Sequence, residues 1–258
     1  MNVYETLADW RTARQAMTGQ VGFVPTMGAL HRGHASLLQR SVAECASTVL
    51  SIYVNPTQFN NPADLEHYPR TMEADLAVAR ELGVDAVIVP SYQELYPDGY
   101  RYRIEEQGFS DSLCGAHRPG HFTGVLTVVM KLLNLVRPTR AYFGEKDFQQ
   151  YQLIRDMAAA FFVDAEIIAC PTVREPDGLA QSSRNALLDA DGRRLAPQFA
   201  RLLRSTASDA EVARQLAAAG FTVDYVETHG GRRFGAVIVE GAGRQVRLID
   251  NVPANEAA

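Results

Sequence analysis

The amino-acid sequence predicts an α/β protein: a Rossmann-like, doubly wound parallel sheet, followed by a small α+β lid domain at the C-terminus. Short runs rich in β-branched and aromatic residues alternate with helix-period stretches through the first two thirds of the chain, and this alternation indicates parallel strands joined by helical crossovers. After about Thr172 the pattern changes to helices followed by strands. We therefore expect two domains, residues 1–172 and 173–258.

The first domain contains short segments with the length and composition of buried strands, at residues 21–25, 48–54, 85–89, 140–143 and 165–170. Between them lie stretches with helical periodicity, at residues 34–44, 72–82, 122–136 and 148–161. Ligands bind at the carboxyl ends of the strands in such sheets. A functional site is therefore expected in the loops that follow these strands.

The second domain begins with two expected helices, at residues 193–204 and 209–219. Alternating strands follow at residues 222–227, 235–239 and 245–249, with glycine-containing turns at 229–231 and 241–243. We expect the end of the chain, from residue 253, to be frayed.

The composition excludes several classes of protein. With 47% hydrophobic and 21% charged residues, the 258-residue chain can bury a large core. A net charge of -5 argues against nucleic acid or an anionic membrane surface as the partner. Three widely spaced cysteines fit neither a disulfide framework nor a zinc cluster, and neither a signal peptide nor a membrane span is apparent. A cytoplasmic location is the simplest expectation.

Lysine is rare in this sequence. Of the 25 basic residues, only Lys131 and Lys146 are lysines, and a compact ammonium suits different sites from a planar guanidinium. Lys146 lies between an expected strand and a helix, which favours a functional role. Lys131 lies in the middle of an apolar helix, which favours snorkelling or a local ion pair.

The first expected loop, PTMGALHRGH at residues 25–34, has the features of a phosphate site. His31 and His34 lie three residues apart at a helix start, so both rings can face one anion near the positive end of the helix dipole. Gly28 and Gly33 allow close approach of the backbone. The alternatives are two surface histidines or a metal site, and the lack of nearby cysteine or carboxylate ligands disfavours the metal.

The second loop, VNPTQF at residues 54–59, places two amide side chains at the same sheet edge. Asn55 and Gln58 can both donate and accept hydrogen bonds, which suits the orientation of a small polar substrate. An Asn-Pro turn that merely ends the strand explains this segment equally well. Further along, Tyr68 to Thr71 is expected to be a helix entry, with Thr71 as its cap.

Two later segments add basic and amide groups: RPGH at residues 118–121 and GEKDFQQ at 144–150. In the second, backbone amides, the helix dipole and the Lys146 ammonium would converge on one anion, and Gln150 would reach the same crevice. A solvated helix start with an incidental lysine is the alternative.

The last segment of interest, residues 173–185, combines an Asp177-Gly178 turn with two serines beside an arginine. Ser182, Ser183 and Arg184 have a phosphate-binding composition, and a flexible segment at a domain junction could close over a nucleotide. Serine and arginine are also ordinary surface residues, so this tripeptide alone is weak evidence.

Taken in order, these motifs resemble the pantothenate synthetase (pantoate:β-alanine ligase) family, within the nucleotidylyltransferase superfamily that shares the H-x-G-H loop. The matching segments, which span nearly the whole chain, are PTMGALHRGH (25–34), VNPTQF (54–59), YPRT (68–71), RPGHFTGV (118–125), GEKDFQQ (144–150), DGLAQSSRN (177–185) and RLIDN (247–251). The resemblance implies a homodimeric, AMP-forming ligase that uses ATP as a substrate, with Mg²⁺ assisting. It further implies that (R)-pantoate is activated as an enzyme-bound pantoyl adenylate, which β-alanine then converts to pantothenate.

The resemblance also implies residue roles. His34 would be the proton donor and His31 its companion on the phosphates, while Lys146, Ser182, Ser183 and Arg184 would hold the triphosphate. The other implied ATP-binding positions are Met27, Gly28, Ala29, Leu30, Arg32, Gly33, Gly144, Glu145, Asp147, Val173 and Gln181. The implied substrate-binding positions are Gln58, Gln150, Asn55 and Arg118, with Gln58 also near the β-alanine site. The sequence does not identify the magnesium ligands.

This sequence departs from the family pattern in two places. Gln181 stands where relatives carry Met or Leu, which a backbone contact to ATP would tolerate. The segment 193–220 is shorter than usual, from which we expect altered lid motion rather than lost chemistry.

Other functions remain as alternatives. The nearest is another adenylyl- or cytidylyltransferase that transfers a whole nucleotide to a phosphorylated acceptor. A binding module without catalytic activity is a second, although it would not need His31, His34 and Lys146 together. An aminoacyl-tRNA synthetase is disfavoured by the acidic charge and by the lack of a further domain for tRNA.

Overall fold

The computed structural model describes residues 1–241 and 244–254, which divide between two compact units. The first unit comprises Met1–Glu145 and Gln149–Cys170, and the second comprises Lys146–Phe148 and the residues from Pro171 onward. Part of the predicted turn at 241–243 and most of the predicted frayed end lie outside the described residues.

The first unit is built on a six-stranded sheet in the order β1-β4-β3-β2-β5-β6, with every neighbouring pair parallel. Its strands are β1 (Asn2–Tyr4), β2 (Val21–Thr26), β3 (Ser47–Ile52), β4 (Ala86–Ile88), β5 (Arg140–Gly144) and β6 (Glu166–Cys170). The predicted α/β fold with a parallel sheet is confirmed. The short edge strand β1 was not predicted.

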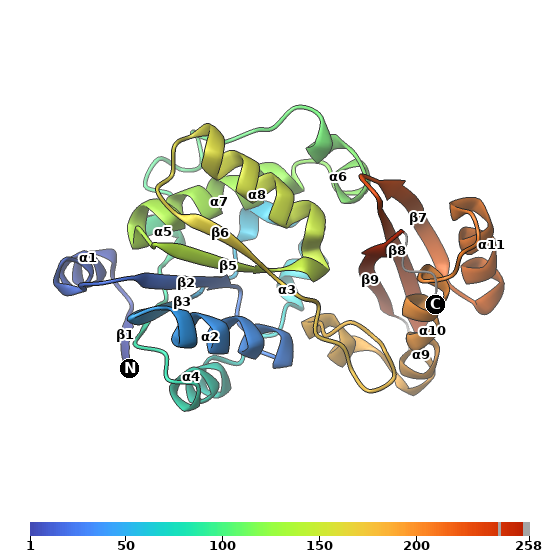
Figure 1. Ribbon diagram of the computed structural model, residues 1–258, viewed down its shortest axis with the longest axis horizontal. Helices are drawn as coiled ribbons and strands as arrows, with labels where there is room; N and C mark the ends of the chain where they lie inside the picture. Colours follow the sequence, from blue (N-terminus) through green and yellow to red (C-terminus); the bar gives the residue numbers. More distant parts are fainter. Residues whose placement is uncertain (242–243, 255–258) are drawn as a thin grey trace. The chain divides into compact units, whose positions relative to one another are not determined.

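Helices cover both faces of this sheet. The helices in this part of the chain are α1 (Leu7–Ala16), α2 (Arg32–Glu44), α3 (Pro62–Glu66), α4 (Met72–Glu81), α5 (Tyr92–Leu95), α6 (Cys114–His117), α7 (His121–Val136) and α8 (Phe148–Ala160). Helices α2 and α4 lie on one face, and α7 and α8 lie on the other (Figure 1). Between the layers, Phe23, Leu38, Leu50, Tyr142 and Ile154 are fully buried, as expected for a sheet covered on both sides.

The strand order places the carboxyl ends of β2 and β5 side by side, at the position where ligands bind in sheets of this type. Strand β2 lies between β3 and β5, with Phe23 opposite both Val49 and Ala141. From β2 the chain moves outward to β3 and β4, and then crosses back to β5 on the other side. The carboxyl ends of β2 and β5 therefore form the switch point of the sheet.

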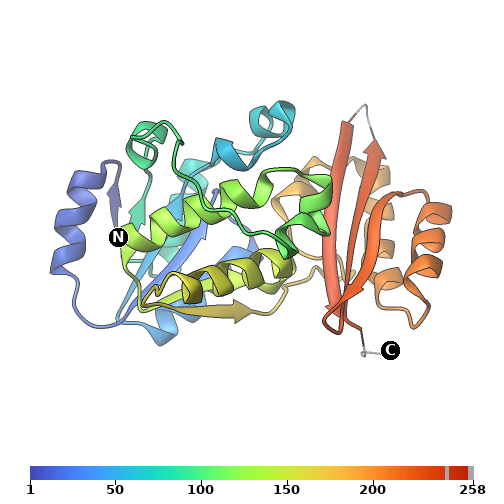
Figure 2. The same ribbon diagram turned by 90° about the horizontal axis from the view of Figure 1, so that it is seen from above.

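The second unit contains an antiparallel sheet of β7 (Thr222–His229), β8 (Arg232–Gly241) and β9 (Arg244–Pro253). The turn between β7 and β8 uses Gly230 and Gly231, with φ of 56° and 77°, which is the backbone that a two-residue hairpin turn requires. Figure 2 shows α9 (Ala190–Leu195), α10 (Pro197–Leu203) and α11 (Asp209–Ala219) on one face of this sheet.

A separate hydrophobic core holds the second unit together, with Phe199, Leu203, Leu216, Val237 and Leu248 all buried. The single helix expected at 193–204 is two helices, because Pro197 begins α10 and lacks the amide hydrogen that a continuous helix needs. Among the described residues, no helix is both long enough and apolar enough to cross a membrane.

Candidate active site

The two histidines of the H-x-G-H segment lie together at the start of α2. His31 is the N-cap of this helix, and its Nδ1 accepts a hydrogen bond from the Gly33 amide at 3.1 Å. The His31 and His34 rings stack with their centroids 4.0 Å apart and their planes inclined by 27°. Because Nδ1 of His31 is an acceptor, the neutral ring carries its proton on Nε2.

A buried carboxylate holds the loop that precedes these histidines. Asp75 on α4 is 2% exposed, and it accepts the amides of Ala29 and Leu30 at 2.9 and 2.7 Å. Thr71 is the N-cap residue of α4, as predicted, although its hydroxyl donates to Asp75 at 3.1 Å and accepts no helix amide. The Ala29 and Leu30 amides therefore donate to Asp75. Sequence reasoning missed Asp75.

The same carboxylate explains why the loop needs Gly28. The φ of Gly28 is 80°, and a Cβ at this position would lie 2.9 Å from Asp75 Oδ2 and 3.1 Å from Ile52. Both the backbone conformation and the lack of space favour glycine. The close approach of loop and carboxylate thus depends on the absence of a side chain.

The Asn55 side chain is buried, 1% exposed, and it orients Gln58. Its Oδ1 accepts from the hydroxyls of Tyr96 at 2.9 Å and Thr57 at 3.0 Å, and its Nδ2 donates to Gln58 Oε1 at 3.1 Å. The Gln58 Nε2 in turn lies 3.2 Å from Met27 Sδ. Burial raises the pKa of Tyr96 to about 12, so its hydroxyl stays a donor at neutral pH. Asn55 therefore acts on Gln58 from within the core.

The backbone of Gln58 is held by the segment that begins α7. The Gln58 carbonyl lies 2.9 Å from His121 Nδ1 and accepts from Arg118 Nη2 at 3.3 Å. A Cβ at Gly124 would lie 2.4 Å from the Thr57 carbonyl oxygen, so only glycine permits α7 to pack this closely against the loop. The structure thus brings the predicted Asn55, Gln58 and Arg118 into one cluster.

Two adjacent glutamines on α8 have different surroundings. Gln149 is 5% exposed and bonds to the backbone of Cys114, Phe109 and Ser112. Gln150, the residue predicted to bind substrate, is half-buried. In the preceding loop, no described residue other than the two chain neighbours of Gly144 lies within 4 Å of the position that a Cβ there would take.

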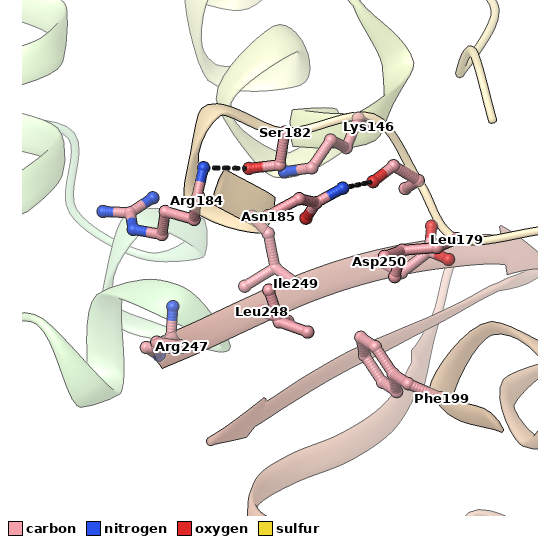
Figure 3. Close-up of a pocket in the computed structure, with 11 residues that line it drawn as sticks. Lys146, Leu179, Ser182, Arg184, Asn185, Phe199, Arg247, Leu248, Ile249 and Asp250 are labelled. Atoms are coloured by element: carbon pink, nitrogen blue, oxygen red, sulfur yellow. Dashed lines mark hydrogen bonds between the residues drawn. The ribbon is translucent and has the colours of Figure 1, made fainter. Parts of the chain in front are cut away.

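The second unit contains a pocket rich in cationic groups (Figure 3). It is lined by Lys146, Leu179, Ala180, Ser182, Arg184, Asn185, Phe199, Arg247, Leu248, Ile249 and Asp250. Three of these side chains are cationic and one is a carboxylate, a composition that suits a polyphosphate. The pocket brings together Lys146, Ser182 and Arg184, all of which were predicted from the sequence.

The remaining predicted residues of this segment lie around the pocket. The Gln181 amide donates to the Val173 carbonyl at 2.9 Å, and Ser183 begins the 3₁₀ turn Ser183–Leu187. The Ser182 hydroxyl accepts the Arg184 amide at 3.2 Å and caps this turn. Asp147 lies beside Lys146, with 3.7 Å between Oδ1 and Nζ.

Sequence reasoning missed the third cation of the pocket, Arg247 on β9. Its Nε lies 2.7 Å from Asp224 Oδ2, and its side chain is 21% exposed. The RLIDN segment, which Arg247 begins, contributed to the family resemblance without a role for any of its residues. Its position in a recurring motif was the signal that could have identified it.

A doubly wound sheet with stacked histidines at a helix start beside the switch point defines a nucleotide-binding α/β enzyme. The family model for pantoate-beta-alanine ligase matches residues 2–253 of the chain. The chain therefore belongs to the pantoate-β-alanine ligase family.

Individual relatives agree with this assignment. Proteins named pantothenate synthetase from Bdellovibrio bacteriovorus and Legionella pneumophila (strain Lens) are 53% and 51% identical to the chain, each over 97% of it. The alignments cover 98% and 99% of those relatives.

Solved structures agree with the assignment to this family. The pantoate-β-alanine ligase of Francisella tularensis, determined in complex with β-γ ATP and β-alanine, is 38% identical, with a TM-score of 0.94 over 100% of this chain and 99% of its own. Pantothenate synthetase from Thermus thermophilus is 39% identical, with a TM-score of 0.87 over 98% of this chain and 99% of its own.

Proposed function

We propose that the chain condenses (R)-pantoate with β-alanine in an ATP-dependent, AMP-forming ligase reaction that yields pantothenate. The observation that supports this most directly is the stacked pair His31 and His34 at the N-terminus of α2, in a chain that belongs to the pantoate-β-alanine ligase family. An imidazole pair at a helix start is suited to phosphate chemistry.

In the first step, a carboxylate oxygen of pantoate attacks the α-phosphorus of ATP. A bond forms between that oxygen and phosphorus, the bond to the β-phosphate oxygen breaks, and pyrophosphate leaves with the electron pair. Charge builds on the leaving group, so preorganised cations and donors supply most of the acceleration. We assign this role to Lys146, Ser182, Ser183 and Arg184, with His34 as proton donor and His31 beside it.

In the second step, the amine of β-alanine attacks the acyl carbon of the pantoyl adenylate. The amide bond forms, the bond from carbon to the phosphate oxygen breaks, AMP leaves and the amine loses a proton. Gln58 and Gln150 would orient pantoate, and Gln58 would also contact β-alanine. Because Asn55 donates to Gln58 Oε1, the Gln58 amide presents its NH₂ group as a donor.

The backbone of the two phosphate loops would complete the ATP site at Met27, Gly28, Arg32, Gly33, Gly144, Glu145, Asp147 and Val173. Mg²⁺ would enter as MgATP, since the described residues contain no cluster of three His, Cys, Asp or Glu side chains and phosphate-bound Mg²⁺ needs few protein carboxylates. A homodimer in the cytoplasm is proposed from the family resemblance.

Isotope exchange tests the proposal. With ATP and pantoate alone, the enzyme should exchange labelled pyrophosphate into ATP, and AMP should be released only when β-alanine is added. A product that keeps the nucleotidyl group would instead identify a nucleotidylyltransferase. A protein that binds ATP without turnover would identify a binding module.

A further inference from the structure

We propose that Asp250 and Asn251, adjacent residues on β9, are positioning residues that hold the two sides of the triphosphate pocket in register. The inference rests on the proposed function, because it takes ATP as the ligand of this pocket. Each residue forms a separate connection to one of the predicted phosphate-binding segments. Both are buried, with 4% and 3% exposure.

Asp250 anchors the segment that leads to the two serines. It forms a two-pronged ion pair with Arg174, with Nη1 to Oδ2 at 2.7 Å and Nη2 to Oδ1 at 2.9 Å. Arg174 also donates to the Gly178 carbonyl at 3.1 Å, and its backbone pairs with Ala180. Such a fork is geometrically specific, so it fixes the hairpin of residues 173–181 against β9.

The hairpin and the phosphate-binding turn are joined by further hydrogen bonds. Asn185 Nδ2 donates to Glu175 Oε1 at 2.9 Å and to the Ala180 carbonyl at 3.0 Å. Ser182 and Arg184 therefore lie between Ala180, which belongs to the hairpin, and Asn185, which is hydrogen-bonded to it. A shift of the hairpin relative to Asp250 would move these pocket residues with it.

Asn251 anchors the segment that carries Lys146. Its Oδ1 accepts from Arg232 Nη1 at 2.5 Å, which orients the amide, and its Nδ2 donates to the Lys146 carbonyl at 2.9 Å. The Arg232 guanidinium lies 4.1 Å from the centroid of the Phe148 ring. The segment Lys146–Phe148 is thus held at both ends: Asn251 bonds the Lys146 carbonyl, and Arg232, itself bonded to Asn251, packs on the Phe148 ring.

Adjacency on one strand explains why these two contacts matter for binding ATP. Neighbouring residues of a strand are separated by about 3.3 Å, so β9 fixes the distance between the Lys146 backbone and the hairpin that leads to the Ser182–Arg184 turn. Catalytic groups that shift by about 1 Å lose much of their effect. Loss of either anchor should therefore weaken ATP binding specifically.

The test compares Asp250→Asn and Asn251→Asp with the unchanged enzyme. The first removes the charge opposite Arg174, and the second replaces the donor that faces the Lys146 carbonyl while keeping an acceptor for Arg232. We expect KM for ATP, and its Kd by calorimetry, to rise about tenfold or more, as for a lost charge-assisted hydrogen bond. KM for pantoate and for β-alanine should stay within about twofold, since a change confined to this pocket spares their binding.

Asp209→Asn is the matched control. It breaks another ion pair of the second unit, Arg233 Nε to Asp209 Oδ1 at 2.7 Å, whose residues do not line the pocket. It should lower the melting temperature with KM for ATP unchanged. If Asp250→Asn does not fold, Arg174→Lys keeps the charge without the fork and should give a smaller rise in KM.

The outcomes separate the two proposals. An unchanged enzyme that neither binds ATP nor forms pantothenate would contradict the proposed function. An active enzyme whose Asp250 and Asn251 variants keep both a normal KM for ATP and a normal rate of pyrophosphate exchange overturns the positioning role.

Discussion

The two lysines of the chain have different surroundings. Lys131 lies 3.3 Å from Asp98 and 5.0 Å from the centroid of the Tyr96 ring, so the predicted local ion pair is confirmed. Lys146 instead lines the cationic pocket of the second unit. The two lysines therefore have different roles, one in packing and one in the proposed chemistry.

Lys146→Arg should lower the rate of pyrophosphate exchange by about tenfold or more, because a planar fork cannot replace a compact ammonium against the phosphates. Lys131→Arg is the matched control, since a guanidinium can still pair with Asp98 and lie over Tyr96. Equal exchange rates in the two variants would refute the assignment of Lys146.

Tyr53 gives a prediction about stability. Its hydroxyl is buried, and no described residue provides a hydrogen-bond partner. Tyr53→Phe should therefore raise the free energy of unfolding by about 1 kcal/mol at pH 7, because a buried unsatisfied group is removed. Urea unfolding measures this, and a destabilised variant would contradict it.

The same tyrosine predicts a pH dependence. Burial raises the pKa of Tyr53 above its usual value. Its titration therefore leaves stability unchanged below about pH 10 and lowers it as the pH rises further, when only the unfolded chain ionises. Above about pH 10, the free energy of unfolding of the Phe variant should fall by about 1.4 kcal/mol less per pH unit than that of the unchanged protein. Urea unfolding at a series of alkaline pH values measures the difference, and parallel losses in the two proteins would contradict it.

At the scale of the element, the end of α8 carries local strain. Phe162 has a φ of 55° and is 93% exposed, and the Val163 amide donates to the Ala158 carbonyl at 2.9 Å as the helix ends. Phe162→Gly should raise stability by about 0.5 to 1 kcal/mol, because glycine tolerates this backbone. Phe161→Gly, without a positive φ, should lower the melting temperature. A similar fall in melting temperature in both glycine variants would contradict the prediction.

The long elements were predictable because their side-chain pattern follows from burial. Strands β2, β3 and β5 are buried runs of apolar residues, and α7 is apolar around most of its surface. Strand β1 has three residues, too few to show a pattern. Helix α1 went unrecognised because only Leu7 and Trp10 of its residues are buried, too few to show a helical apolar face.

At the scale of the whole molecule, the reactive groups were more predictable than the groups that support them. The histidines, the amides and Lys146 lie in short motifs, where residue type and spacing carry the information. Asp75 acts on a loop 45 positions away, and Asn251 on a carbonyl 105 positions away. Contacts of this kind follow from the fold, and no local pattern indicates them.

The central claim is that pantoate is activated through its own carboxylate oxygen. Pantoate labelled with ¹⁸O in the carboxylate tests this directly, with AMP analysed by mass spectrometry after β-alanine is added. One labelled oxygen should appear in the phosphate of AMP, because the oxygen that attacked phosphorus leaves with it. Unlabelled AMP, formed together with pantothenate, would contradict the acyl adenylate mechanism.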